Sequence, residues 1–131
     1  PGLGGQDRGV LLSGRVAERD SAYHLARVDF NGASLWIRDE GLAPGTPVRL
    51  RVLARDVSVT LEEPQHTSIQ NHWRGTVRNV HPDAHPSQVL LKLDCNAVTL
   101  ECRITRRAFD ALGLGVGRTV WARVKSAALA R

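Results

Sequence analysis

The sequence predicts an all-β protein built from two similar small barrel units joined in tandem. Three observations predict this fold class: short apolar or alternating runs, an Asn-Gly step between two of them, and an internal repeat. The chain has 131 residues, of which 42% are hydrophobic and 24% charged, a composition typical of folded rather than disordered proteins. No apolar run approaches the ~18 residues of a membrane-spanning helix.

Short strands dominate the first half of the chain. In Val57–Leu61, valine and leucine alternate with hydroxyl residues, which predicts a strand with one buried face. The step Asn31–Gly32 predicts a type I′ hairpin, because that turn needs positive φ at both positions. In the second half, Arg106–Leu112 with Gly113 behind it predicts one short helix with a glycine stop. The other strands predicted in the first half are Val10–Glu18, Tyr23–Phe30, Ser34–Arg38 and Val48–Val52.

The second half of the chain repeats the first. Three pairs of segments align: Gly41–Val52 with Gly113–Val124 (113 − 41 = 72), Val28–Leu35 with Leu93–Leu100 (93 − 28 = 65), and Gly14–Val16 with Gly75–Val77 (75 − 14 = 61). The offset grows because the second copy has a longer hairpin and the extra helical turn. We therefore predict a first unit at residues 1–63 and a second unit at residues 64–131.

Each unit fits a small Greek-key barrel of OB type, because five strands with glycine-punctuated turns suit that architecture. The predicted fold is two tandem OB-like Greek-key β-barrel units, with one short helical turn in the second. Units of about sixty residues bury little surface alone. We therefore expect the two barrels to pack on each other and to use a further partner surface.

Catalytic motifs are missing from the sequence. It contains no Walker-type phosphate loop, no Gly-x-Ser-x-Gly, no His-Glu-x-x-His and no paired carboxylates, so we predict no catalytic residue in this chain. The glycine-rich segment Gly113–Thr119 precedes a strand rather than a helix, which favours a turn over a phosphate-binding loop. His81 and His85 could ligate a metal, but a loop-filling role in the long hairpin is the favoured interpretation.

The two cysteines flank a predicted hairpin turn. If Asn96–Ala97 is a two-residue turn, paired residues have numbers that sum to 193, so Cys102 faces Leu91 and not Cys95. Neither a cross-strand disulfide nor a two-cysteine metal site follows from this register. We expect both thiols to be buried as small apolar groups.

Two segments of the second unit carry polar groups suited to an anion. Gln65–Val77 is dense in hydroxyl and amide side chains, and Lys125 and Ser126 follow an apolar strand. Hydroxyls, backbone N–H groups and one ammonium suit a tetrahedral oxyanion, which offers only acceptors. The alternative interpretation is an inter-unit turn held by local bonds, with Lys125 as an ordinary cation at a strand end.

The same segments resemble a known family. Ala54–Leu61 followed by Pro64–Asn71 is similar to the C-terminal region of the ATP-binding subunit of bacterial molybdate ABC importers. Val124–Ser126 resembles the lysine motif that closes molybdate-binding Mop units. The similarity covers essentially the whole chain and implies a tandem Mop (TOBE, or di-Mop) regulatory domain. Members of this family bind molybdate or tungstate at subunit interfaces.

The resemblance also implies a set of ligands, with the anion held as an oxyanion and no metal bound directly by side chains. Gln70 stands where family members often have a basic residue, which lowers the positive charge of the site. The first unit has Leu53 at the position of Lys125 (125 − 72 = 53), and Gln6–Asp7 at the positions of Thr67 and Ser68. We therefore expect the first unit to be degenerate and to have no site of its own. The implied molybdate-binding residues are Thr67, Ser68, Ile69, Gln70, Asn71, Thr105, Lys125 and Ser126.

The resemblance further implies a function for the parent protein. Such a domain senses intracellular molybdate and inhibits transport by bridging two copies, as a homodimer or higher homo-oligomer with the anion at the interface. The chain contains no methionine, and we expect it to be a piece of a longer protein. That parent would be an ATPase subunit with a nucleotide-binding domain, partnered by membrane subunits. It would lie in the cytoplasm, peripheral to the inner face of the cell membrane.

Three other functions compete with this one. The chain could be a free-standing intracellular molybdate-storage or homeostasis protein of the same fold, or an accessory domain of an importer for another solute. The net charge of +5 suggests a nucleic-acid-binding OB module. Such surfaces need aromatic stacking platforms, and the chain has only three Trp, one Tyr and two Phe. Because Trp36, Trp73 and Trp121 lie beside apolar neighbours on predicted strands, we expect them in the core, and no nucleic-acid partner.

Overall fold

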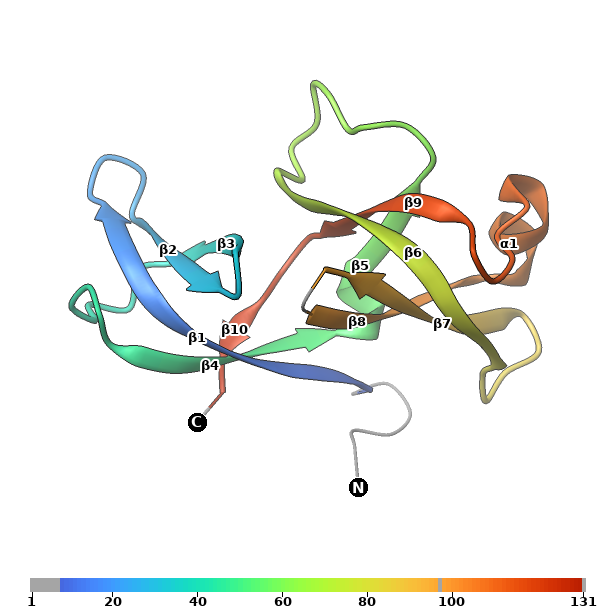
Figure 1. The fold of residues 1–131 in the computed structure, drawn as a ribbon, viewed down its shortest axis with the longest axis horizontal. Coiled ribbons are helices and arrows are strands. Elements are labelled where there is room, and N and C mark those ends of the chain that lie inside the picture. The colour runs from blue at the N-terminus through green and yellow to red at the C-terminus, as the bar shows by residue number, and fades with distance from the viewer. Residues whose placement is uncertain (1–7, 97, 131) are drawn as a thin grey trace.

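The computed structural model describes residues 8–96 and 98–130, and its elements are almost all β-strands. Two five-stranded antiparallel sheets curl into half-barrels that lie side by side (Figure 1). The first sheet has the order β10-β4-β1-β2-β3, and the second has the order β5-β9-β6-β7-β8. The predicted all-β fold class is confirmed.

The bounds of the elements are as follows. The first sheet contains β1 (Gly9–Asp20), β2 (Leu25–Phe30), β3 (Ala33–Arg38), β4 (Pro47–Leu53) and β10 (Ala128–Leu129). The second contains β5 (Val57–Thr60), β6 (Asn71–Pro82), β7 (Gln88–Cys95), β8 (Val98–Thr105) and β9 (Thr119–Val124). A 3-10 turn, η2 (Ala54–Asp56), connects β4 to β5, and one helix, α1 (Arg106–Leu112), follows β8.

The two sheets exchange strands. β5 precedes the predicted boundary at residue 63, yet it pairs with β9 in the second sheet. β10 comes from the end of the chain, yet it pairs with β4 in the first sheet, and Figure 1 shows this crossing. Each sheet therefore contains one strand from the other half of the sequence. The boundary between the two units at residues 63 and 64 therefore stays a prediction from the sequence repeat.

The repeat itself appears in the backbone geometry. β1 has a bulge between Val16 and Glu18, and β6 has one between Val77 and Asn79, at the same offset of 61. Gly45 and Gly117 both have φ of 92°, a conformation that favours glycine. The Gly45 N–H donates to the Val16 carbonyl at 2.7 Å, and the Gly117 N–H donates to the Val77 carbonyl at 2.8 Å. The alignment of the two copies is confirmed.

The predicted turns and the helix are also confirmed. Asn31 and Gly32 both have positive φ, at 50° and 86°, as a type I′ hairpin requires. α1 begins after Thr105, whose hydroxyl accepts a hydrogen bond from the Ala108 N–H, and it ends at Gly113 with φ of 64°. Between β7 and β8, Leu91 pairs with Cys102, as the register with sum 193 predicted.

One hydrophobic core extends through both sheets. Leu35 and Leu50 of the first sheet and Leu91 and Leu100 of the second are fully buried members of the same cluster. The expected packing of the two units on each other is confirmed. The expectation that all three tryptophans lie in the core is wrong: only Trp73 packs against it.

The other two tryptophans alternate out of the core. Leu35 and Ile37 are buried, so Trp36 between them lies on the opposite face of β3. Val120 and Ala122 are buried in β9, so Trp121 between them projects the other way, where its ring meets His72. The apolar neighbours of Trp36 and Trp121 face the core because side chains in a strand alternate between faces.

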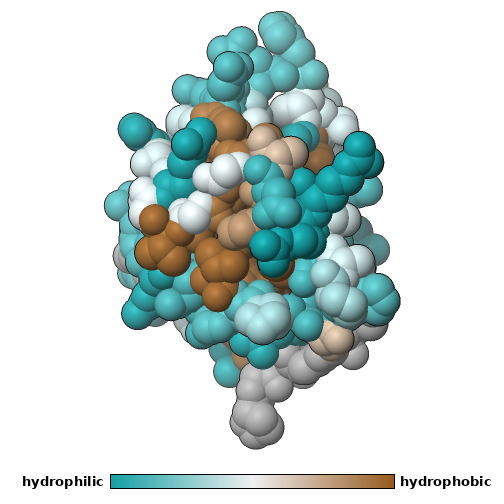
Figure 2. Space-filling model, turned by 90° about the vertical axis from the view of Figure 1, so that its right-hand side faces the viewer, coloured by the Kyte–Doolittle hydropathy of each residue, from teal (hydrophilic) through white to brown (hydrophobic). Residues whose placement is uncertain are grey.

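The surface has one feature that bears on partners. At the end of the molecule that carries α1, hydrophobic side chains gather in a patch surrounded by hydrophilic ones (Figure 2). Val116, in the turn between α1 and β9, is exposed at that end. Within the described residues, no helix is both long and apolar enough to cross a membrane.

Candidate functional site: a pocket between the two sheets

A pocket of about 320 Å³ lies where the two sheets meet. Five of the eight residues implied as ligands line this pocket. These five are Ser68, Ile69, Gln70, Asn71 and Lys125. Val124 adds an apolar contact from the same unit, and the first unit supplies Asp20, Tyr23, Leu25 and Trp36. The structure therefore brings Lys125 and the loop Ser68–Asn71 of the second unit to one pocket.

Lys125 reaches the pocket because β9 alternates. Val124 is buried in the core, so Lys125 next to it is exposed on the pocket side. The Lys125 N–H donates to the Asp56 carbonyl at 2.8 Å, which fixes the end of β9 against η2. Lys125 forms no ion pair within the described part of the chain. Its ammonium therefore remains available to a ligand.

The loop before β6 presents further donors. Thr67 organises it: its hydroxyl accepts from the Ile69 N–H at 3.1 Å and from Nη2 of Arg123 at 2.7 Å. Thr67 itself does not line the pocket. The side chains of Ser68 and Gln70 are exposed and make no hydrogen bond to any described residue. Thr67 thus stabilises the turn between the units through local hydrogen bonds, which was the alternative interpretation of this segment. Ser68 and Gln70 remain available to a ligand.

Asn71 holds the two halves of the pocket together. Its Oδ1 accepts from the Trp36 N–H at 2.9 Å, and its Nδ2 donates to the Trp36 carbonyl at 3.0 Å. β3 is the last strand of the first sheet, so this side chain pairs backbone groups that would otherwise be unpaired at a sheet edge. One amide proton of Asn71 remains for a ligand.

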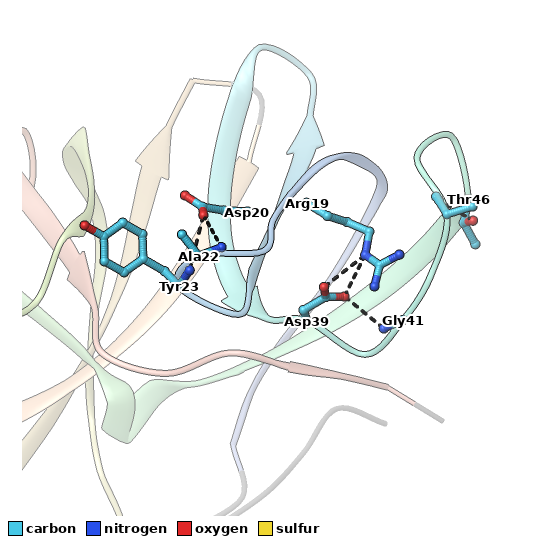
Figure 3. Close-up of polar contacts among 8 residues, drawn as sticks. Arg19, Asp20, Ala22, Tyr23, Asp39, Gly41 and Thr46 are labelled. Atoms are coloured by element: carbon cyan, nitrogen blue, oxygen red, sulfur yellow. Dashed lines mark hydrogen bonds and ion pairs between the residues drawn. The ribbon is translucent and has the colours of Figure 1, made fainter.

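The first unit contributes residues that sequence reasoning missed. Asp20 ends β1, and its Oδ1 accepts from the N–H groups of Ala22 and Tyr23 at 3.1 and 3.2 Å (Figure 3). The tight turn leaves the Tyr23 ring exposed beside the pocket. The spacing Asp-x-Ala-Tyr signals an Asx-type turn. Nothing in the sequence places that turn beside a loop almost fifty residues away.

A second turn stabilises the same end of the first sheet. Both Asp39 carboxylate oxygens accept from Nε of Arg19, and its Oδ1 also accepts from the Gly41 N–H (Figure 3). The bond from Gly41 and the guanidinium of Arg19 lower the pKa of Asp39. Asp39 therefore stays charged and holds the β3–β4 connection near the base of the β1–β2 turn.

Besides Thr67, two more implied ligands lie outside the pocket, Ser126 and Thr105. Ser126 follows Lys125 but does not line the cavity. Thr105 pairs with Gln88, at the end of the second sheet where β6 finishes at Pro82. The pocket lies beside Asn71, where the same long strand begins. Within one chain, Thr105 is therefore at the opposite end of the sheet from Lys125.

Leu53 and His85, two further positions discussed from the sequence, have structural roles. Leu53, at the position that matches Lys125, lies half-buried in β4, and Gln6 and Asp7 lie outside the described residues. His85 accepts from the Ser87 N–H at 3.1 Å and contacts its hydroxyl at 2.7 Å, which confirms its loop-filling role. In the described ranges, no group of three or more His, Cys, Asp or Glu side chains is arranged to hold a metal ion.

Comparisons with known proteins show which proteins this chain is similar to. Residues 67–130 match the TOBE domain family. The molybdenum import ATP-binding protein ModC of Methylococcus capsulatus is 44% identical over 125 residues, which is 95% of this chain and 35% of that protein. ModC 1 of Azotobacter vinelandii is 42% identical over 124 residues, 95% of this chain and 34% of that protein. The chain thus spans about a third of these relatives.

A solved structure also resembles this fold. It is the cytoplasmic molybdate-binding protein ModG with molybdate bound, which superposes with a TM-score of 0.76 at 25% sequence identity. The match covers 92% of this chain and 94% of ModG. The likeness in fold therefore extends over both sheets.

Proposed function

We propose that this chain, whose residues 67–130 match the TOBE domain family, is a molybdate- or tungstate-binding regulatory domain of the ATP-binding subunit of a molybdate importer. The observation that carries the proposal is the pocket that joins Lys125 to the loop Ser68–Asn71. These segments lie more than fifty residues apart in the sequence. The side chains of Ser68, Gln70 and Lys125 make no hydrogen bond or ion pair to any residue that the structure describes. The ModC relatives and the ModG structure support molybdate as the ligand.

The chemistry of the pocket suits a tetrahedral dianion bound without direct metal ligation. The Ser68 hydroxyl, the Gln70 amide and the Lys125 ammonium are donors, and an oxyanion offers only acceptors. An ammonium is a compact point charge that needs no planar partner, unlike a guanidinium. Donors spaced for molybdate or tungstate would leave some unpaired around the smaller sulfate, which costs binding free energy.

The position of Thr105 supports a site shared between two copies. Since Thr105 lies at the far end of the second sheet, it can join Lys125 and Ser126 at one anion only from another chain. The apolar patch near α1 is a further surface for such a contact (Figure 2). The proposed assembly is a homodimer or higher homo-oligomer with the anion at the interface. It would bind about one anion per chain, because the first unit lacks the lysine.

The bridging anion also provides the proposed regulation. When intracellular molybdate is high, two bridged domains would hold the nucleotide-binding domains of the parent ATPase subunits apart and so inhibit transport. The anion can shift the equilibrium toward the bridged state only by the free energy with which it binds the bridged domains more tightly than the separate ones. In this proposal the parent protein lies in the cytoplasm, peripheral to the membrane through the membrane subunits of the importer.

Calorimetric titration with molybdate, tungstate and sulfate tests the binding. We expect saturable binding of molybdate and tungstate near one anion per chain, and at least tenfold weaker binding of sulfate. No heat from any of the three anions would refute the proposed ligand class. A clear stoichiometry of two per chain would show that the first unit also binds.

A free-standing molybdate-storage protein is the second candidate. It is favoured by one observation: the fold superposes on the molybdate-binding protein ModG with a TM-score of 0.76. The two functions predict the same pocket and differ in the parent protein. A nucleotide-binding domain in the same polypeptide supports the importer subunit, and a mature chain that ends with the two sheets supports storage.

A further inference from the structure

The charges that line the pocket cancel. Lys125 brings one ammonium, and Asp20, from the other unit, brings one carboxylate. The remaining lining residues are uncharged. A pocket for a dianion would be expected to carry net positive charge, so a carboxylate at this place calls for an explanation.

Asp20 is not tied up in an ion pair. One carboxylate oxygen, Oδ1, accepts the two N–H groups of its own turn, while Oδ2 has no hydrogen bond or salt bridge within residues 8–96 and 98–130. Figure 3 shows Oδ2 directed away from those two N–H groups. The side chain is half-buried. Partial burial reduces the screening of its charge by solvent, so its field extends into the pocket.

We propose that Asp20 is the residue that sets the anion affinity of this pocket, by repelling the bound dianion and keeping the affinity below what Lys125 and the loop donors could provide. This inference rests on the proposed oxyanion function. The repulsion acts on the ligand directly and grows with the ligand's charge. The domain would then respond only at a higher anion concentration. A sensor that must not respond to traces of its ligand needs this property.

Asp20→Asn tests the inference because it removes the charge and keeps the turn. An asparagine Oδ1 can accept the same two N–H bonds from Ala22 and Tyr23. The matched control is Asp29→Asn, which removes one carboxylate from β2 of the same unit at a position that lines a different pocket. Both variants change the net charge of the chain equally.

The readout compares two isosteric ligands of different charge. Molybdate is a dianion, and perrhenate is a tetrahedral monoanion of similar size. Calorimetric titration should show that Asp20→Asn tightens molybdate binding about tenfold and perrhenate binding only about threefold, since the Coulomb free energy halves with the ligand charge. Asp29→Asn should leave both affinities within about twofold of the parent protein.

Two results would overturn the inference while leaving the proposed function intact. In one, the parent binds molybdate and Asp20→Asn does not tighten it. In the other, both ligands tighten by the same factor, which would indicate a rearranged turn rather than a removed charge. If neither the parent nor Asp20→Asn binds any of these anions, the proposed function fails and the inference fails with it.

Discussion

Burial governs the chemistry of the two cysteines. Cys95 and Cys102 are both free and buried. Burial raises the pKa of Cys95 from its ordinary value of 9.0 to about 11, and that of Cys102 to about 12. The thiolate, which is the reactive form, is therefore scarce near neutral pH. The prediction of buried thiols came from the hairpin register and from the usual behaviour of cysteine as a small apolar group, and the structure confirms it.

We predict that neither thiol reacts with a thiol-specific disulfide reagent at pH 8 until the protein unfolds. The pKa values of both thiols are higher in the folded protein than in the unfolded chain. The protonated thiols therefore stabilise the fold fully below pH 9, and this stabilisation is lost as the pH rises toward 11 and 12. The free energy of unfolding should therefore fall above pH 9. Rapid labelling of native protein, at the rate of a free thiol, would contradict the assignment.

At the scale of secondary-structure elements, Asn71 matters because it joins two sheets through one side chain. Asn71 begins β6 and pairs both backbone groups of Trp36 on the edge strand β3. Asn71→Ala would leave one N–H and one C=O without partners. We predict a loss of about 2 kcal/mol in the free energy of unfolding, measured by urea denaturation.

Asn71→Ala should also weaken anion binding, because Trp36 and Asn71 line the same pocket. Asn79→Ala is the matched control: it removes an amide from the same strand, eight positions further along and away from the pocket. Equal stability losses in both variants would show that the bridge to β3 contributes nothing specific.

Thr105 caps α1, and it is also a proposed ligand supplied by a second copy. Thr105→Ala should destabilise the fold by about 1 kcal/mol, because the Ala108 N–H loses its acceptor. Thr105→Ser should restore the cap and anion binding together. If the Thr105→Ala variant binds molybdate as tightly as the parent protein, then the Thr105 hydroxyl acts only as a helix cap. Thr105 would then not be a ligand in the proposed shared site.

At the scale of the whole molecule, local patterns predicted the elements but not how they meet. The Asn31–Gly32 turn, the helix Arg106–Leu112 and the strand register depend on neighbouring residues, so the sequence predicted them well. The exchange of β5 and β10 depends on contacts between distant segments, which periodicity does not encode. Asp20 was missed in the pocket for the same reason.

Ligand binding should stabilise the whole molecule, since both sheets line the pocket. A ligand at about 100 times its dissociation constant adds ~2.7 kcal/mol to the free energy of unfolding. We therefore predict that millimolar molybdate or tungstate raises the Tm by several degrees, while equal sulfate does little. Identical melting curves in the three salts would count against an oxyanion site.

The most direct test of the account is calorimetric titration of molybdate into Lys125→Ala, with Lys92→Ala as the control. Lys92 lies on β7, outside the pocket, and its removal changes the net charge equally. A charge-assisted bond is worth ~1.5–3 kcal/mol, so Lys125→Ala should weaken binding roughly tenfold to hundredfold. Because Lys125 points away from the core, the Lys125→Ala variant without ligand should have the same melting curve as the parent protein. Parent-like affinity in Lys125→Ala, or an equal loss in Lys92→Ala, would contradict the claim that Lys125 binds the anion.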